Sequence, residues 1–461
     1  MSATPNVLFV FADQLRASAV GCYHDEPVRT PRIDRFAEEG VLFPVAASCT
    51  PLCGPYRASL LTGMQAVNNG AVVNDLRLGD AHETLAERFA KAGYDTAYIG
   101  KWHLDGPDRI SPVPAGRRRR GFAYWAAANF EHNYTDSKYY RDQQPERLVW
   151  PGYDAQSQAD DVIAFLRNRS GSRAPFLAVL SWGPPHNPYR MVPERFLQQY
   201  DKRAIQPRPN AGEFPLEDLW GYYAQTTFID EQFGRILDAL KDAGLEESTL
   251  VVFTSDHGDM HGSHGVYKKG WPWDESLRVP MIARWPGRIP AGARAQFPIA
   301  TVDLMPTLLG LCGLEPQAAD GVDCSAGMID PTRAVQESVL ISNPCPAHVL
   351  DTRGDDMVPD YKGRRMEYRG VRTLRHTYIE TLDGPWLLYD NVQDPYQLRN
   401  LVDSPEHAQL REQLRTDMWE HLRKVGDRFE PKEAYYSRFG IDVDEKGLLK
   451  GVIKNPYPAT N

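Results

Sequence analysis

The chain has 461 residues, enough for a large α/β domain with a smaller companion. Its 52 Lys and Arg residues face 61 Asp and Glu residues, and the resulting net charge of −9 argues against a nucleic-acid-binding protein. Hydrophobic residues make up 42% and charged residues 25% of the chain, which excludes a disordered or fibrous protein.

No segment has the pattern of a membrane anchor or a targeting signal. The apolar run Val7 to Ala12 meets Asp13 at once, and no later run approaches the roughly 20 apolar residues that a spanning helix needs. The six cysteines are sparse and form no C-x-x-C pair. We therefore expect no membrane association and a cytoplasmic location, although a chain from which a leader had been removed would look the same.

Strand-like apolar runs alternate with helical patterns along most of the chain. In chain order we expect a strand at Asn6–Ala12, a helix at Thr84–Ala92, a strand at Thr96–Gly100, a helix at Asp160–Arg167, a strand at Pro175–Trp182, a helix at Leu219–Ala243, and strands at Thr249–Ser255 and Val279–Trp285. Apolar runs without alternation are typical of buried parallel strands. The pattern predicts an α/β fold, with a large, mostly parallel sheet between two layers of helices.

Beyond about residue 330 the pattern changes. Tyr368–Leu382 alternates between apolar and polar residues as half-buried antiparallel strands do, and His407–Val425 has the pattern of a polar amphipathic helix. These features predict a smaller C-terminal α+β subdomain with an antiparallel sheet. We place the catalytic domain at residues 1–335 and the subdomain at residues 336–461.

The residues just after four of the expected strands are unusually polar for a buried sheet. In chain order they are Asp13 and Gln14, Lys101 and His103, His186, and Asp256 and His257. A single Asp after a strand is more often a helix cap than a ligand. In α/β sheets, however, functional groups gather at the carboxyl ends of strands, so four such clusters predict one site.

Part of this set has the chemistry of a metal site. Asp13, Gln14, Asp256 and His257 offer two carboxylates, an amide oxygen and an imidazole. Such donors suit a hard divalent cation better than zinc. A cation held there could bind an anionic ester and lower the pKa of a coordinated hydroxyl.

The most specific segment runs Cys53-Gly-Pro-Tyr-Arg57-Ala-Ser-Leu-Leu-Thr-Gly63. It resembles the sulfatase signature C-x-P-x-R followed by x-x-x-L-T-G, which a maturation enzyme reads to oxidise the cysteine to formylglycine. Tyr56 departs from the Ser or Ala that many members have at that position. The alternative interpretation is a buried cysteine in a strand-to-helix turn.

The resemblance extends over most of the chain. The matching stretches are Asn6 to Gln14, Gly93-Tyr94, Gly100 to Leu104, Ser255 to Gly258, Gly262 to Gly265, Lys269, Glu275 to Pro280, Leu388 to Asp390 and Asp394-Pro395. It implies the alkaline phosphatase-like fold. Many family members have Asp where this chain has Gln14 and Asn where it has His257. We expect calcium as the cation, with manganese or magnesium as alternatives.

The resemblance also implies roles for single residues. Formylglycine at Cys53 would be hydrated to a diol that contacts the cation; one hydroxyl would attack sulfur, and loss of the proton of the other would release sulfate. Arg57 and Lys101 would hold the diol and sulfate oxygens, and His103 would act as a base. His186 and Lys269 would contact the sulfate and protonate the leaving alcohol. Asn74 would face the substrate.

Two other functions compete with a sulfatase. A phosphonate monoester hydrolase or phosphodiesterase of the same superfamily shares the Asp-Gln and Asp-His pairs but generally lacks the pair Lys101 and His103. A non-catalytic protein that binds sulfated ligands would not need the nucleophile, the metal ligands and the acid–base groups together. We therefore expect hydrolysis of sulfate monoesters, with a small-molecule or oligosaccharide substrate and the maturation enzyme as partner.

The substrate class is suggested by one aromatic and basic stretch. Phe122, Tyr124, Trp125, Phe130, His132 and Tyr134 follow the charge run Arg117–Arg120. These side chains could form a rim that binds a sulfated carbohydrate. The alternative is that the aromatic residues belong to the core and the arginines to a solvated loop.

Overall fold

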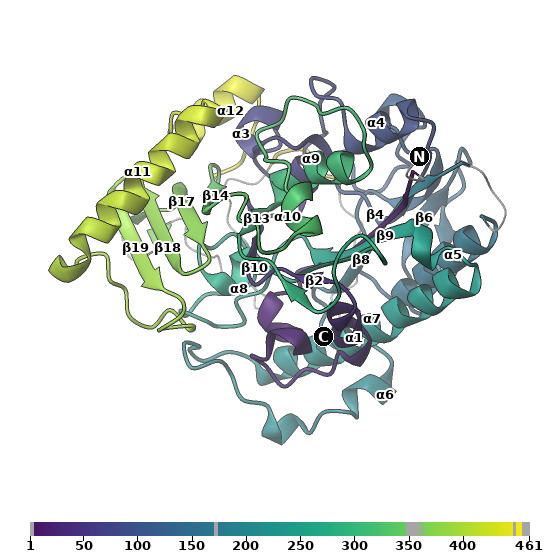
Figure 1. Ribbon diagram of the computed structural model, residues 1–461, viewed down its shortest axis with the longest axis horizontal. Helices are drawn as coiled ribbons and strands as arrows, with labels where there is room; N and C mark the ends of the chain where they lie inside the picture. Colours follow the sequence, from purple (N-terminus) through teal and green to yellow (C-terminus); the bar gives the residue numbers. More distant parts are fainter. Residues whose placement is uncertain (1–3, 170–173, 347–359, 362–363, 446–448, 454–461) are drawn as a thin grey trace.

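The computed structural model describes residues 4–169, 174–346, 360–361, 364–445 and 449–453 (Figure 1). A 10-stranded sheet forms its centre, with the strand order β12-β2-β11-β9-β1-β8-β4-β5-β6-β7. The strands are β12 (Ala293–Arg294), β2 (Val41–Leu42), β11 (Met281–Arg284), β9 (Thr249–Ser255), β1 (Asn6–Asp13), β8 (Phe176–Pro185), β4 (Asp95–Lys101), β5 (Tyr124–Ala128), β6 (Lys138–Arg141) and β7 (Leu148–Val149). The five from β9 to β5 are parallel, which confirms the predicted α/β fold.

Helices cover both faces of this sheet. One face carries α1 (Pro31–Glu38), α5 (Asp154–Arg167) and α7 (Leu216–Asp242), and the other carries α2 (Cys53–Thr62), α4 (Leu85–Lys91) and α9 (Thr301–Leu311). Successive residues of β1 alternate between the two layers: Leu8 and Val10 pack with the first, Val7 and Phe9 with the second. Shorter helices are α3 (Ala66–Asn69), α6 (Glu194–Leu197), α8 (Asp274–Leu277) and α10 (Ser325–Ile329).

Two predicted elements differ most from the observed bounds. Helix α5 begins at Asp154 instead of Asp160, because its first turns bury polar residues such as Gln158 and so lack an apolar pattern. The strand expected at Val279–Trp285 is divided. Its start belongs to β10 (Arg278–Val279), which joins β3 (Ala46–Ala47) and β13 (Ile299–Ala300) in a separate sheet, while β11 pairs antiparallel with β9.

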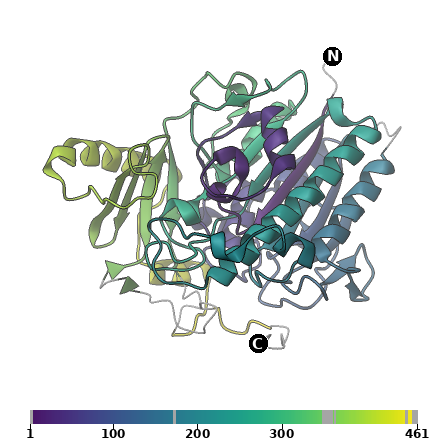
Figure 2. The same cartoon turned by 90° about the horizontal axis from the view of Figure 1, so that it is seen from below.

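A four-stranded antiparallel sheet follows in the C-terminal part, in the order β14-β17-β18-β19. Its strands are β14 (Ser338–Asn343), β17 (Tyr368–Thr373), β18 (His376–Thr381) and β19 (Gly384–Asp390), and α11 (Ala408–Val425) packs on them (Figure 2). Helix α12 (Lys432–Phe439) and a small pair, β15 (Asp360–Tyr361) and β16 (Arg364–Arg365), complete this part. The antiparallel sheet is as predicted; the division at residue 335 stays a prediction.

The register of the central strands brings their carboxyl ends to one edge. Ala12 pairs with Ser255, and Asp13 pairs with Pro185. At the next strand, Gly100 lies against Ser181, where a Cβ atom would be only 2.0 Å from the Ser181 carbonyl oxygen. Glycine is therefore required for β4 and β8 to stay this close. The register of β9, β1, β8 and β4 brings the residues that follow these strands to one edge of the sheet.

Among the residues that the structure describes, neither a membrane-spanning helix nor a disulfide is found. Within the part of the chain that the structure describes, no helix is both long and apolar enough to cross a membrane. All six cysteines are buried as free thiols. The thiol chemistry of the chain therefore depends on the surroundings of each cysteine.

The buried Asp154 should make stability depend on pH. Its side chain is 2% exposed, and burial raises its pKa from 3.8 to about 8. Between these two pH values the folded protein keeps a proton that the unfolded chain has lost, so stability falls as pH rises. We expect Asp154→Asn to raise the free energy of unfolding by about 1 to 3 kcal/mol near pH 7.5 and to change it little near pH 4.

Denaturant unfolding at a series of pH values measures this effect. Asp160→Asn is the matched control, since Asp160 lies exposed on the same helix. A decline with pH that is equally steep in Asp154→Asn and wild type would contradict the prediction.

Candidate active site

Four side chains converge beyond the ends of β1 and β9. The ligand atoms of Asp13, Cys53, Asp256 and His257 all lie within 4.8 Å of one another, and all four residues are buried. His257 Nδ1 donates to the Gly258 carbonyl at 3.0 Å, so Nε2 keeps its lone pair. That Nε2 lies 3.6 Å from Asp13 and 3.5 Å from Asp256. The group can hold a metal ion.

Gln14 adds an oxygen to this donor set. Its backbone has a left-handed φ of 71° and donates its N–H to Asp256 Oδ1 at 2.9 Å. Its Oε1 is buried and has no hydrogen-bond partner among the described residues. An unsatisfied buried oxygen is costly, and a cation beside it would satisfy it.

The two carboxylates also fit a cation electrostatically. Burial raises the pKa of Asp256 to about 6, and the neighbouring Asp13 charge adds to this effect. Burial opposes ionisation of Asp13 as well, but Lys101 and Lys269 hold its pKa well below the ordinary value. Two carboxylates this close repel each other, and a divalent cation between them would remove the repulsion.

Cys53 lies where an anion is stabilised. It is the first residue of α2, and its Sγ is 3.3 Å from His257 Nε2 and 3.0 Å from Lys269 Nζ. Burial and Asp13 oppose ionisation of the thiol, yet Lys101, Lys269 and His257 hold its pKa well below the ordinary value. An oxygen of formylglycine at this position would meet the same charges.

Arg57 is buried and contacts both carboxylates of this group. Its Nη2 is 3.3 Å from Asp13 Oδ2 and 3.3 Å from Asp256 Oδ2. Its Nη1 donates to the Lys101 carbonyl and to Ser181 Oγ, each at 2.6 Å. Only its Nε has no hydrogen-bond partner among the described residues. Arg57 thus fixes the two carboxylates and β4 relative to each other.

Asn74 supports the start of α2. Its Oδ1 accepts the backbone N–H of Gly54 at 2.9 Å, and the side chain is half-buried. This contact holds the turn that carries Cys53. The contact with substrate that the sequence suggested stays a prediction.

Two lysine–histidine pairs line the space around Cys53. Lys101 Nζ donates to His132 Nε2 at 2.9 Å, and Lys269 Nζ donates to His186 Nε2 at 3.0 Å. The two imidazole rings are 3.9 Å apart. Burial and the neighbouring positive charges hold the pKa of both histidines well below the ordinary value. Two ammonium groups beside neutral imidazoles provide surroundings suited to an anion.

His103 belongs to a chain of contacts that the sequence did not reveal. Its Nε2 donates to Asp75 Oδ1 at 3.1 Å, and Arg109 binds the same carboxylate through two nitrogens. The opposite nitrogen, Nδ1, is buried without a hydrogen-bond partner among the described residues. His103 is therefore oriented with a basic nitrogen free for reaction. Asp75 follows Asn74 directly, but nothing in the sequence links Arg109 to it.

The predicted aromatic and basic rim is wrong for part of the stretch. Phe122 and Trp125 belong to the core between the sheet and its helices. Arg119 and Arg120 are buried too, and Arg120 forms ion pairs with Asp80 and Glu87, so they are not part of a solvated loop either.

Other aromatic residues of the stretch do reach the site. Phe130 is half-buried, with its ring 4.9 Å from His103 and 4.6 Å from His132. Tyr134 is buried and donates to the His186 carbonyl at 2.7 Å. Tyr124 is half-buried and donates to Asp161, away from this group.

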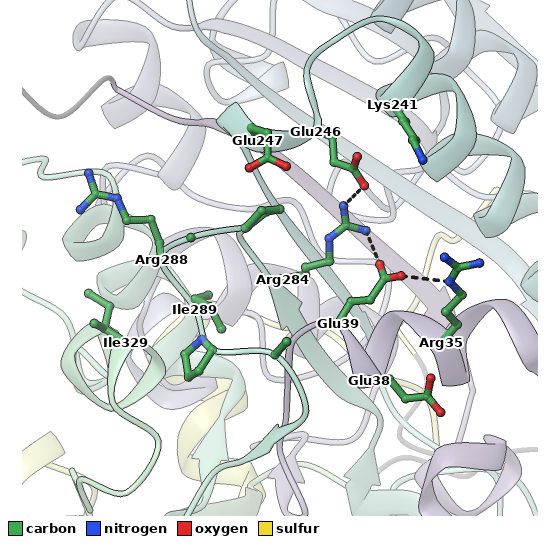
Figure 3. Close-up of a pocket in the computed structure, with 14 residues that line it drawn as sticks. Arg35, Glu38, Glu39, Lys241, Glu246, Glu247, Arg284, Arg288, Ile289 and Ile329 are labelled. Atoms are coloured by element: carbon green, nitrogen blue, oxygen red, sulfur yellow. Dashed lines mark hydrogen bonds and ion pairs between the residues drawn. The ribbon is translucent and has the colours of Figure 1, made fainter.

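A cavity of about 720 Å³ lies elsewhere (Figure 3). It is lined by Arg284 at the end of β11 and by residues that precede β9, such as Glu246. Because Arg284 pairs with Val251 near the start of β9, this cavity is at the opposite edge of the sheet from Asp256. Four of its charged side chains pair in the chain Arg35–Glu39–Arg284–Glu246.

Comparisons with known proteins agree on one family. A family model described as Sulfatase matches residues 5–314. The chain is 36% identical to an ulvan-active sulfatase of Formosa agariphila, over 99% of this chain and 90% of that protein. It is 31% identical to an endo-4-O-sulfatase of Bacteroides thetaiotaomicron, over 92% of each.

Solved structures show the same relationship. One from the glycosaminoglycan metabolism of Bacteroides thetaiotaomicron has a TM-score of 0.83 and 29% identity, covering 94% of this chain and 99% of that chain. A phosphonate monoester hydrolase of Silicibacter pomeroyi has a TM-score of 0.73 at 23% identity, covering 92% and 96%, which shows a shared fold. The match over most of the chain and the intact Cys53 signature lead to one conclusion: the chain belongs to the sulfatase family of sulfuric ester hydrolases.

Proposed function

We propose that the protein hydrolyses sulfate monoesters of a carbohydrate, with Cys53 converted to formylglycine as the nucleophile. The observation that carries this proposal is the pair of lysine–histidine contacts around Cys53. Lys101 and Lys269 are both buried and supply positive charge beside this group, which favours binding of a negatively charged sulfate ester. The sulfatases that this chain resembles include an ulvan-active and an endo-4-O enzyme, which favours a carbohydrate as the alcohol part.

A divalent cation would be held by Asp13, Gln14, Asp256 and His257 together with the residue at position 53. When bound, it supplies a positive charge that polarises a sulfate oxygen and lowers the pKa of a hydroxyl beside it. Two carboxylates and an amide oxygen favour calcium, while the imidazole of His257 also suits manganese. Magnesium is a further alternative.

The remaining residues divide the proton transfers and the binding of sulfate. Lys101 and His132 bind sulfate oxygens on one side, and the proton of the Lys269–His186 pair passes to the leaving alcohol. His103 accepts a proton through its free Nδ1, since its Nε2 is committed to Asp75. Formylglycine supplies two hydroxyls on one carbon, so one can attack while the other later loses the proton that releases sulfate.

The two alternative functions are less well supported. A phosphonate monoester hydrolase shares the fold, but only at 23% identity, and Lys101 with His103 favours sulfate as the substrate. A non-catalytic binder would not need an oriented base such as His103 next to an intact nucleophile. We therefore retain the phosphonate activity only as a side reaction to be measured.

Maturation of Cys53 should depend on when the modifying enzyme meets the chain. Cys53 is 1% exposed and its helix is buried throughout, so an enzyme cannot reach it in the folded protein. We expect formylglycine at Cys53 after co-expression with a maturation enzyme, and none when that enzyme is added to purified folded protein. Fragmentation mass spectrometry checks this, with Cys49 as an internal control that stays a thiol. Active protein in which Cys53 is entirely thiol would contradict the mechanism.

Substitutions in the sulfate pocket should separate sulfate from phosphonate chemistry. We expect Lys101→Ala and His103→Ala each to lower kcat/KM for a sulfate ester by about 10² to 10⁴. Lys138→Ala is the matched control, because Lys138 pairs with Asp136 at the surface. The measurement compares a sulfate and a phosphonate monoester with the same leaving group. A wild-type preference for the phosphonate that Lys101→Ala leaves unchanged would contradict the assignment.

The carbohydrate part of the proposal is tested separately. Sulfated mono- and oligosaccharides are compared with nitrophenyl sulfate as substrates of the matured wild-type protein. We expect at least one sulfated saccharide to exceed nitrophenyl sulfate in kcat/KM by tenfold or more, since only a cognate sugar gains binding energy outside the sulfate pocket. If nitrophenyl sulfate is the best substrate of the panel, the proposed substrate class is wrong.

A further inference from the structure

The amide of Gln14 has two chemically different ends, and only its oxygen can bind a cation. Its NH₂ group can only donate hydrogen bonds. If Gln14 is a ligand, its side chain must be held with the oxygen toward Asp256 and His257. A reversed amide would present two hydrogens to the cation and weaken its binding. Something on the far side of the amide must therefore fix its orientation.

Asp259 lies at that far side. Gln14 Nε2 donates to Asp259 Oδ2 at 2.6 Å. The same carboxylate accepts the Tyr189 hydroxyl at 2.6 Å and the backbone N–H of His261 at 3.0 Å. All of these neighbours are donors, so the carboxylate acts as an acceptor at both oxygens. Reversing the Gln14 amide would set oxygen against oxygen.

Tyr189 reinforces this orientation. Its hydroxyl gives its hydrogen to Asp259 and accepts one from Gln14 Nε2 at 3.2 Å. The Asp259 backbone is fixed as well, because Arg16 Nη1 donates to its carbonyl at 3.0 Å. Asp259 and Gln14 are both buried, at 1% and 0% exposure, so water cannot replace these contacts. Both hydrogens of the Gln14 amide are thus used, while its oxygen has no partner among the described residues.

We propose that Asp259 is a positioning residue that turns the Gln14 amide oxygen toward the cation site. The inference rests on the proposed role of Gln14 as a ligand. Asp259 binds no cation itself in this arrangement; it acts through Gln14. Residues that orient metal ligands in this way typically affect metal affinity about 10- to 100-fold when they are changed.

The test uses calcium chloride titrated calorimetrically into the full-length, chelator-stripped protein. In Asp259→Asn, the remaining oxygen is the acceptor for the backbone N–H of His261, so the new NH₂ group faces the NH₂ group of Gln14. Two donors then face each other, and we expect calcium affinity to fall about tenfold or more. Gln14→Glu alone sets two carboxylates against each other and should also weaken binding. In the double variant Gln14→Glu/Asp259→Asn, the new amide donates to one oxygen of Glu and leaves the other for calcium. Affinity should return to within about threefold of wild type.

This reversal of sign separates positioning from a merely structural role. Asp259→Asn should lower affinity when residue 14 is Gln and raise it when residue 14 is Glu. If Asp259 only supports the fold, its loss lowers affinity in both backgrounds. The comparison within the Glu background also decides the matter if Asp259→Asn alone does not fold. Tyr189→Phe is the matched control and should weaken binding less than Asp259→Asn does, because the Asp259 acceptor remains.

Two reference variants show which proposal fails. Asp256→Ala removes a proposed ligand and should abolish calcium binding, and Gln14→Ala should weaken it about tenfold or more. Unchanged binding in Gln14→Ala would overturn the ligand role of Gln14 and with it the role of Asp259. Weakened binding in Gln14→Ala together with unchanged binding in Asp259→Asn would overturn the positioning role alone.

Discussion

Asp13 and Asp256 lie side by side in the protein interior, and the Arg57 guanidinium is 3.3 Å from each. Like charges this close are unfavourable without a counter-charge, and burial strengthens the effect. Arg57 supplies one such charge from below, and the proposed cation would supply the other. The same guanidinium reaches the Lys101 carbonyl and Ser181, so one side chain connects α2 to four strands of the sheet, β1, β9, β4 and β8.

The sheet register converts this contact into a site. Since β9, β1, β8 and β4 are parallel and aligned, each contributes the residues that follow it to the same edge. Cys53 reaches the same place as the first residue of α2, a helix that covers one face of the sheet. Its Sγ therefore faces the carboxylates, His257 and Lys269 together. A rigid sheet edge is a suitable scaffold for groups that must be placed before the reaction begins.

Around this centre, the proposed acid–base groups and the proposed ligand Gln14 each have a neighbour that influences their charge or their orientation. Burial and the neighbouring positive charges hold the pKa of His132 and His186 well below the ordinary value. Asp75 accepts a hydrogen bond from His103, and Asp259 accepts one from Gln14. These neighbouring residues are all buried, which restricts the orientation of the groups that they contact. The arrangement explains why residues that touch no substrate should still alter metal affinity or turnover.

The sequence alone determined the parts that depend on local chemistry. Apolar runs located the central strands, and C-x-P-x-R indicated the proposed nucleophile, because both signals consist of neighbouring residues. The bounds of α5 and the burial of Arg119 and Arg120 could not be predicted, since each depends on contacts with other elements. Asp75 and Asp259 act on residues 28 and 245 positions away in the chain, His103 and Gln14. Only the tertiary fold brings such partners together, so only the structure could assign them.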